Sequence, residues 1–100
     1  MKKLKLMASL SEGKCLDIGF AQNPNVFLKD PVGIDIQKVA KPDNYTEVYV
    51  IDVNKENFPF SDESFDTVLA GDIIEHVENP SHFLRESNRV LKTGGKLLLS

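Results

Sequence analysis

The sequence has a single cysteine, no long apolar run and no excess of positive charge. Cys15 is its single cysteine, so no disulfide can form within the chain, and a small buried thiol in a reducing, cytoplasmic setting is expected. No run approaches the roughly twenty apolar residues that a membrane helix needs, so we expect no membrane association. The formal net charge is −3 at pH 7, which argues against nucleic acid as a partner.

What is present is the composition of one folded domain. Of the 100 residues, 41% are hydrophobic and 27% are charged, which is typical of soluble globular proteins and unlike disordered chains. A chain of this length has room for one hydrophobic core, and no repeat, low-complexity tract or linker divides it. We therefore expect residues 1–100 to form a single domain.

Five short apolar runs recur along the chain, each followed by polar or turn-forming residues. Most lack a clean alternation of polar and apolar residues, which favours strands covered on both faces, as in a parallel sheet. The segments 21–30 and 37–44 have room for one or two helical turns at most. The predicted strands cover residues 14–19, 32–36, 47–51, 65–70 and 96–99.

The strongest helix signal lies between the fourth and fifth runs. Asn79 suits the N-cap, and Pro80 fits the first helical position because its missing N–H needs no partner there. Gly94-Gly95 is expected to end this helix, and a shorter helix is expected to start at Asp72. The residues expected on the buried face of the longer helix are Phe83, Leu84, Val90 and Leu91.

Acidic residues stand at or just beyond the ends of four predicted strands, where α/β folds bind ligands. Asp17 precedes the turn at Gly19, so it can brace the N–H groups of the loop and face a cationic ligand group. Taken alone, this turn fits a simple strand end with a capping Asp equally well. Asp35 follows Gly19 by sixteen residues and can accept hydrogen bonds from both ribose hydroxyls, unless it is only a solvated loop residue.

Several motifs together resemble the class I S-adenosylmethionine-dependent methyltransferases. Residues 16–19 resemble the family's strand running into Asp-x-Gly-x-Gly-x-Gly, and residues 52–66 resemble its stretch Asp-x(n)-Leu-Pro-Phe-x-Asp-x-Ser-Phe-Asp. Residues 70–80 follow the same pattern, and residues 85–95 resemble the family's Arg-Val-Leu-Lys-x-Gly-Gly helix end. The resemblance covers about residues 14–100 and is closest to the small-molecule group, type 11-like.

The resemblance implies a three-layer α/β sandwich around a mostly parallel, Rossmann-like sheet. Five strands of the family's seven are present, so a truncated domain is expected. The unpaired apolar edge at residues 97–99 predicts self-association or marginal stability of the chain. The sequence departs from the family at Ala21 and Asn23, which occupy the second and third glycine positions. Because Asn tolerates left-handed geometry, the turn can survive with altered affinity.

The implied cofactor is S-adenosylmethionine, and no metal site is expected. By resemblance, Asp52 meets the adenine amino group, the backbone of Val53 meets the ring edge, and the backbone near Gly71 meets the methionine part. Asp72 could cap a helix or face the cofactor amine. The candidate cofactor-binding residues are Asp17, Gly19, Phe20, Ala21, Asp35, Ile36, Asp52, Val53, Ala70, Gly71 and Asp72.

The implied reaction transfers a methyl group to an acceptor, which we expect to be a small molecule. No catalytic residue is assigned: His76 lies near the expected acceptor entrance, but a lone His more often stabilises a loop than acts as a general base. Two alternatives stay open. One is a degenerate cofactor-binding module without turnover. The other is a nicotinamide oxidoreductase, which would need Gly-x-Gly-x-x-Gly, whereas the window from Gly19 supplies one glycine of the three.

Overall fold

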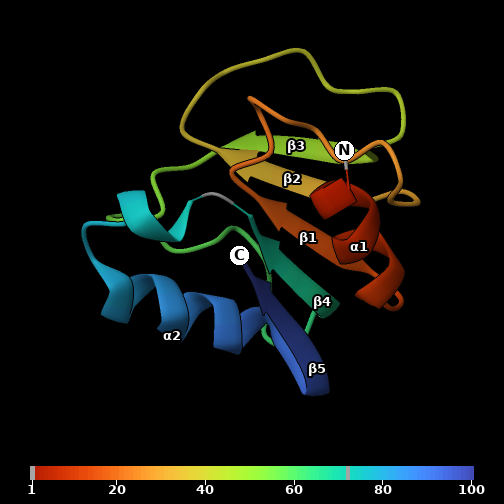
Figure 1. The fold of residues 1–100 in the computed structure, drawn as a ribbon. Coiled ribbons are helices and arrows are strands. Elements are labelled where there is room, and N and C mark those ends of the chain that lie inside the picture. Colours follow the sequence, from red (N-terminus) through yellow and green to blue (C-terminus); the bar gives the residue numbers. More distant parts are fainter. Residues whose placement is uncertain (1, 72) are drawn as a thin grey trace.

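The computed structural model describes residues 2–71 and 73–100, so Asp72, a predicted site residue and helix start, lies outside the described residues. A five-stranded parallel sheet with the order β3-β2-β1-β4-β5 forms the centre of the molecule (Figure 1). Its strands are β1 (Cys15–Ile18), β2 (Val32–Asp35), β3 (Glu47–Val50), β4 (Phe65–Ala70) and β5 (Leu91–Leu99). The strand order reverses between β1 and β4, which makes the crevice outside their carboxyl ends the switch point of the sheet.

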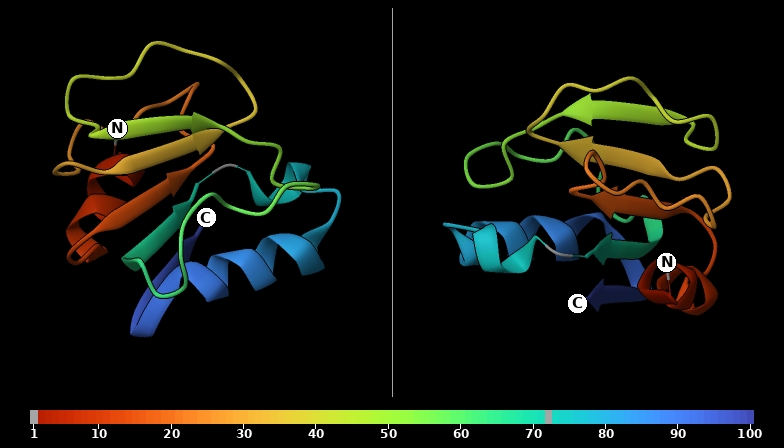
Figure 2. Two further views of the ribbon diagram at one scale, coloured as in Figure 1. Left: turned by 180° about the vertical axis from the view of Figure 1, so that it is seen from behind. Right: turned by 45° about the horizontal axis from the view of Figure 1, so that its top comes forward.

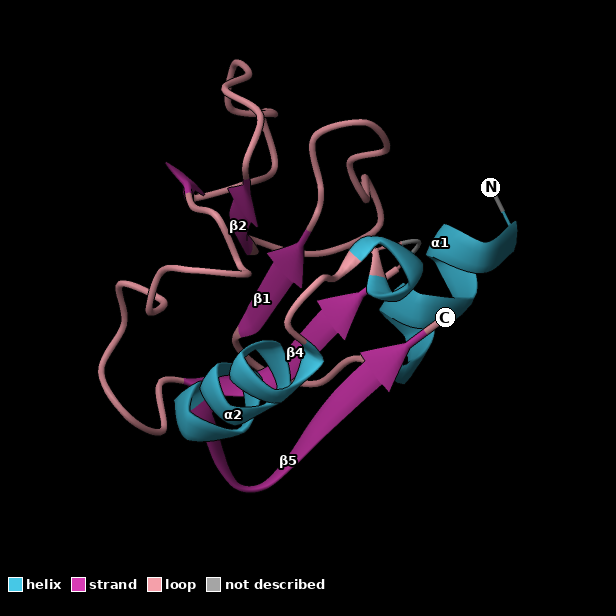
Figure 3. Ribbon diagram, turned by 90° about the vertical axis from the view of Figure 1, so that its left-hand side faces the viewer, coloured by secondary structure: helices cyan, strands magenta, loops and turns pink. Residues whose placement is uncertain are grey.

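Helices cover both faces of the sheet, as the three-layer prediction requires (Figure 3). Helix α1 (Lys2–Leu10) lies on one face and α2 (Pro80–Val90) on the other, and a short 3-10 helix, η1 (Ile74–His76), precedes α2. Successive side chains of β1 and β4 point to opposite faces of the sheet, so each strand packs against both helix layers. Leu16, Ile18, Val68 and Ala70 pack in one core cluster with Phe83 and Val90 of α2. Cys15 and Leu69 pack in a second cluster with Met7 of α1, which confirms the buried thiol.

Helix α1 was not predicted, because the first ten residues offer no N-cap residue and no clear apolar stripe. Only Met7 of α1 is buried, and tertiary contacts hold the helix: the Nδ2 of Asn25 donates a hydrogen bond to the carbonyl oxygen of Leu4 at 3.0 Å. The loops that join β1 to β2 and β2 to β3 contain no helix (Figure 2). Among the described residues, no helix is long and apolar enough to cross a membrane.

Helix α2 starts as predicted and ends earlier. Asn79 is its N-cap, but the predicted end at Gly94-Gly95 is wrong, because α2 ends at Val90 and β5 begins at Leu91. The glycines instead allow an irregularity in β5: Gly94 has a φ of +81°, and a Cβ on Gly95 would lie 2.8 Å from a backbone carbonyl oxygen. Leu84, predicted on the buried face, is 42% exposed.

Gly33, in the middle of β2, makes room for the ring of Phe20. A Cβ at Gly33 would lie 2.6 Å from Cδ1 of Phe20, and that ring is buried against Tyr45 with its centroid 5.1 Å away. We therefore expect Gly33→Ala to lower the free energy of unfolding by about 1–3 kcal/mol, measured by urea denaturation, because the extra methyl overpacks the core. The double variant with Phe20→Leu is the control. If Gly33→Ala lowered the free energy of unfolding equally with Phe and with Leu at position 20, the proposed clash with the Phe20 ring would be contradicted.

Candidate functional site

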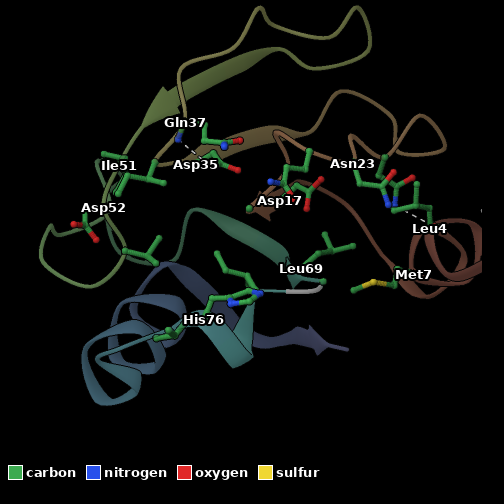
Figure 4. Close-up of a pocket in the computed structure, with 18 of the residues that line it drawn as sticks. Leu4, Met7, Asp17, Asn23, Asp35, Gln37, Ile51, Asp52, Leu69 and His76 are labelled. Atoms are coloured by element: carbon green, nitrogen blue, oxygen red, sulfur yellow. Dashed lines mark hydrogen bonds between the residues drawn. The ribbon is translucent and has the colours of Figure 1, made fainter.

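A cavity of about 310 Å³ opens at the carboxyl ends of the strands, at the switch point (Figure 4). Its walls come from the segments that follow β1, β2 and β3, from the end of β4, from the region around η1 and from α1. This volume is in the range of sites that enclose small organic ligands. The cavity therefore lies where the order of the strands predicts a ligand site.

Most of the predicted site residues meet at this cavity. The seven that line it are Asp17, Gly19, Asp35, Ile36, Asp52, Val53 and Gly71. Phe20 and Ala70 do not line it, because both side chains are buried in the packing around the sheet. Ala21 contributes its backbone N–H to the loop that borders the cavity. Asp72 lies outside the described residues.

Asp35 organises the loop that follows β1. Its Oδ2 accepts a hydrogen bond from the N–H of Ala21 at 2.9 Å, and its Oδ1 accepts one from the N–H of Gln37 at 2.8 Å. From the sequence we expected Asp17 to brace this loop, but its recorded hydrogen bond comes from Tyr45, and Asp35 is the residue that braces the loop. The register explains the difference: Ile18 pairs with Ile34, so the first turn after β1 lies beside the residue that ends β2.

The glycine turn survives the loss of two glycines. Gly19 has a φ of +78°, and within residues 19–24 it is the only one with a positive φ. Asn23 therefore does not adopt the left-handed geometry that its residue type would tolerate. A Cβ on Gly19 would lie 3.0 Å from Cδ1 of Ile73, which lines the cavity, so a side chain there would crowd the site. The substitutions at Ala21 and Asn23 are compatible with this loop.

Asp17 is a buried carboxylate at the base of the cavity. It is 8% exposed, and its Oδ2 accepts a hydrogen bond from the phenol Oη of Tyr45 at 2.5 Å. Burial raises the pKa of Asp17 to about 6; the hydrogen bond from Tyr45 lowers this pKa, and the nearby charge of Asp35 raises it. Among the described residues, no cationic side chain is recorded in contact with the Asp17 carboxylate. This carboxylate is suited to a ligand cation.

The segment after β3 forms another wall and connects to the segment before α2. Oδ1 of Asp52 accepts a hydrogen bond from the N–H of Asn54 at 2.9 Å. The Asn54 side chain in turn accepts hydrogen bonds from the N–H groups of Glu78 and Asn79 at 2.8 and 3.0 Å. Val53, directly between the two, is buried and adds apolar surface. The Asn54 hydrogen bonds therefore fix the segment after β3 relative to the segment before α2.

Sequence reasoning missed several residues of the site. No local motif identifies Lys3, Leu4 and Met7, because they reach the cavity only through the packing of α1 against the sheet. Tyr45 sits in the loop before β3 and carries no pattern of its own. The other lining residues that were not predicted are Gln22, Asn23, Asn25, Gln37, Ile51, Asn54, Leu69, Ile73 and Val77, whereas His76 was expected near the acceptor entrance.

His76 lines the cavity, but its geometry does not assign it a catalytic role. Its side chain is largely exposed, and Nε2 lies 3.7 Å from Oε1 of the neighbouring Glu75. A general base needs a fixed position relative to the proton that it removes. The other histidine, His82, lies on α2, and its Nε2 is 2.8 Å from the carbonyl oxygen of Glu56, so it contacts a loop. Neither histidine identifies a reaction.

The chain is similar to known methyltransferase domains. A family model described as a methyltransferase domain matches residues 16–99. The uncharacterized protein MJ1123 of Methanocaldococcus jannaschii is 36% identical over 100 residues, covering 94% of this chain and 47% of that protein. Demethylmenaquinone methyltransferase of Bacillus velezensis is 33% identical over 72 residues, covering 72% of this chain and 30% of that enzyme.

Solved structures share the fold. The PH0226 protein from Pyrococcus horikoshii OT3 matches with a TM-score of 0.75 at 28% identity, over 98% of this chain and 53% of that one. The chain thus spans about half or less of the length of these relatives. The match to this solved structure covers 98% of this chain and therefore includes its parallel sheet.

Proposed function

Because the chain belongs to the family of methyltransferase domains, we propose that its cavity binds S-adenosylmethionine and serves methyl transfer to a small-molecule acceptor. One observation carries this proposal. The carboxylates of Asp17, Asp35 and Asp52, which lie near the carboxyl ends of three neighbouring strands, line one cavity at the switch point of the sheet. That arrangement suits a ligand with several hydrogen-bond donors and a positive charge.

The chemistry of the lining residues fits this cofactor. Asp35 can accept hydrogen bonds from the ribose hydroxyls, and Asp52 can accept one from the adenine amino group. Ile36 and Val53 would offer apolar surface to the flat ring. The buried Asp17 can pair with the ammonium group of the amino-acid part. When bound, the cofactor supplies an electrophilic methyl group on a sulfonium sulfur.

The contribution of this chain to such a transfer is binding and orientation. Methyl transfer between two bound partners would gain rate from holding them in line, and this positioning is what the residues of the chain would supply. The walls tied together by Asn54 provide that rigidity around the cavity. The name of the Bacillus velezensis relative specifies demethylmenaquinone as what that enzyme acts on, which supports a small organic acceptor here. No acceptor-binding residue is assigned.

Two other predictions from the sequence go with this proposal. Strand β5 lies at one edge of the sheet and Leu99 on it is 47% exposed, which supports self-association through this strand. The cytoplasmic setting rests on the single cysteine. Both stay predictions.

Asp35→Ala is expected to weaken the binding of S-adenosylmethionine and S-adenosylhomocysteine by about 100-fold or more, measured by isothermal titration calorimetry. The variant loses the acceptor for two ribose hydroxyls and the brace on the N–H of Ala21. Each hydrogen bond to a charged group contributes about 1.5–3 kcal/mol, so two of them account for that factor.

Asp43→Ala is the matched control for this change, because it removes the same charge from an exposed loop position off the cavity. It should bind like the wild type, and NADH should bind to neither protein. Wild-type affinity for both ligands in Asp35→Ala would contradict the proposed site.

A further inference from the structure

Tyr45 is a fully buried phenol that reaches the cavity-lining carboxylate from a distant part of the sequence. It is 1% exposed, and its ring packs on Phe20 with the centroids 5.1 Å apart. Its Oη accepts a hydrogen bond from the N–H of Asn25 at 2.9 Å and donates one to Oδ2 of Asp17 at 2.5 Å. Since the backbone N–H can only donate, the phenol proton has to point at the carboxylate.

This geometry leaves the remaining hydrogen-bond acceptor capacity of the Asp17 carboxylate available to a ligand in the cavity. Tyr45 is the one donor recorded to it among the described residues, and Asp17 itself lines the cavity. The other charged or titratable groups that line the cavity are Asp35 at the end of β2, Asp52 beyond β3, Lys3 on α1 and His76 on η1. Tyr45 does not line the cavity and contacts Asp17 from behind it. Burial and the charge of Asp35 oppose ionisation of Asp17, whereas the hydrogen bond from Tyr45 favours it.

We propose that Tyr45 is a positioning residue of the cofactor site: its phenol orients the Asp17 carboxylate and keeps it ionised for the ammonium group of the ligand, which makes the affinity pH-dependent. The inference rests on the proposed function, because the ammonium group belongs to the amino-acid part of the cofactor. A cation that binds an ionised Asp17 must displace its proton when the free site is protonated.

The size of the pH effect follows from the titration of Asp17. With a pKa of about 6, the carboxyl is mostly ionised at pH 7 and mostly protonated at pH 5. If only the ionised form binds the ammonium group, the affinity falls roughly tenfold between these values. Without the phenol the midpoint moves to higher pH, because the hydrogen bond that lowers the pKa of Asp17 is lost.

The test is calorimetric titration of the chain with S-adenosylhomocysteine from pH 5 to pH 7.5. We expect Tyr45→Phe to weaken binding several-fold at pH 7 and to move the pH midpoint upward, and Asp17→Asn to bind weakly with no dependence on pH in this range. Tyr49→Phe is the matched control, because Tyr49 is the other tyrosine and does not line the cavity. 5′-Methylthioadenosine, which lacks the ammonium group, should be insensitive to pH and to Tyr45→Phe.

The outcomes separate this inference from the proposed function. Binding of S-adenosylhomocysteine with the same pH midpoint in wild type and Tyr45→Phe overturns the role of Tyr45 and leaves the cofactor site standing. Equal weakening of both ligands by Tyr45→Phe also overturns it, because a merely structural residue would act on both. A folded chain that binds neither ligand at any pH contradicts the proposed function and the inference together.

A second measurement uses only the wild-type chain, in case Tyr45→Phe does not fold. The ¹³Cζ resonance of Tyr45 should titrate with the midpoint of Asp17, near pH 6, and this midpoint should fall when S-adenosylhomocysteine binds. The resonance of Tyr49 should not follow that midpoint. A Tyr45 resonance that is flat between pH 5 and pH 7 would overturn the inference.

Discussion

Arg89→Ala is expected to lower the free energy of unfolding by about 3–5 kcal/mol, a large share of the roughly 5–15 kcal/mol that holds a typical domain together. The guanidinium group of Arg89 joins α2 to the loop before β4. Its nitrogens donate to both carboxylate oxygens of Glu86 at 2.9 and 3.0 Å, and to the carbonyl oxygens of Phe58 and Phe60 at 2.9 and 2.8 Å. A further donor reaches Oδ1 of Asp62 at 2.9 Å.

The cost of this change comes mainly from Glu86. That side chain is 5% exposed, and without Arg89 the one hydrogen bond recorded to its carboxylate from residues 2–71 and 73–100 is that from the N–H of Phe58 at 2.7 Å. The hydrogen bonds from Arg89 are the main reason that the pKa of Glu86 lies below its usual range. A buried charge that loses its partner is strongly destabilising.

Urea denaturation followed by circular dichroism measures this effect. Arg85→Ala is the matched control, because Arg85 is an exposed arginine on the same helix, and it should change stability by less than about 0.5 kcal/mol. Arg89→Lys should recover little, since an ammonium group cannot reproduce the planar fork. An Arg89→Ala variant as stable as Arg85→Ala would contradict the stabilising role of the Arg89 hydrogen bonds.

Asp17→Asn is expected to have the opposite effect and to raise the free energy of unfolding by about 3 kcal/mol at pH 7. Burial raises the pKa of this carboxyl from its ordinary value of 3.8 to about 6, and one unit corresponds to about 1.4 kcal/mol. The amide oxygen of asparagine can still accept the hydrogen bond from Tyr45. The variant keeps the packing and removes a desolvated charge.

The pH dependence of this difference has a definite sign. Because the folded-state pKa lies above the unfolded-state value, the folded state binds the proton more tightly. The penalty for ionised Asp17 is therefore complete above about pH 6, declines as the pH falls, and vanishes below 3.8. Unfolding of both proteins in urea at pH 7 and pH 3.5 measures it. A variant that is less stable at pH 7, or equally stabilised at both pH values, would contradict the account.

The two predictions about Asp17 oppose each other, and this is informative about the site. The substitution that stabilises the chain is also the one that we expect to remove the counter-ion of the ligand. A protein that retains a destabilising buried carboxylate at a cavity gains from it only when a cation binds. The pair Asp17 and Tyr45 thus connects stability with the proposed function.

The sheet could be predicted from the sequence because its signals are local. Each strand is a compact apolar run ended by a turn. The acidic residues Asp17 and Asp35 lie near the ends of two such runs, and Asp52 follows a third. Parallel strands bring their carboxyl ends to one edge, so the convergence of these carboxylates follows from the fold class. The predicted strands were confirmed, except that β5 begins at Leu91.

The remaining features depend on contacts between distant segments. Helix α1 is held by Asn25 and by the sheet, and the phenol of Tyr45 reaches Asp17 across 28 positions of the chain. Asp35, and not Asp17 as expected, braces the loop after β1. The register of β1 and β2 places the carboxylate of Asp35 beside that turn. No periodicity or spacing in the sequence contains these relations.

The central claim is that the cavity at the carboxyl ends of β1, β2 and β4 holds the cofactor. Its most direct test is to follow the ¹⁵N–¹H resonances of the chain while S-adenosylhomocysteine is added. We expect saturable changes that are largest for the amides of Gly19, Ala21, Asp35 and Val53, with small changes at the amino ends of the strands. Saturable binding with its largest changes at those amino ends, or a folded chain whose spectrum does not respond, would contradict the claim.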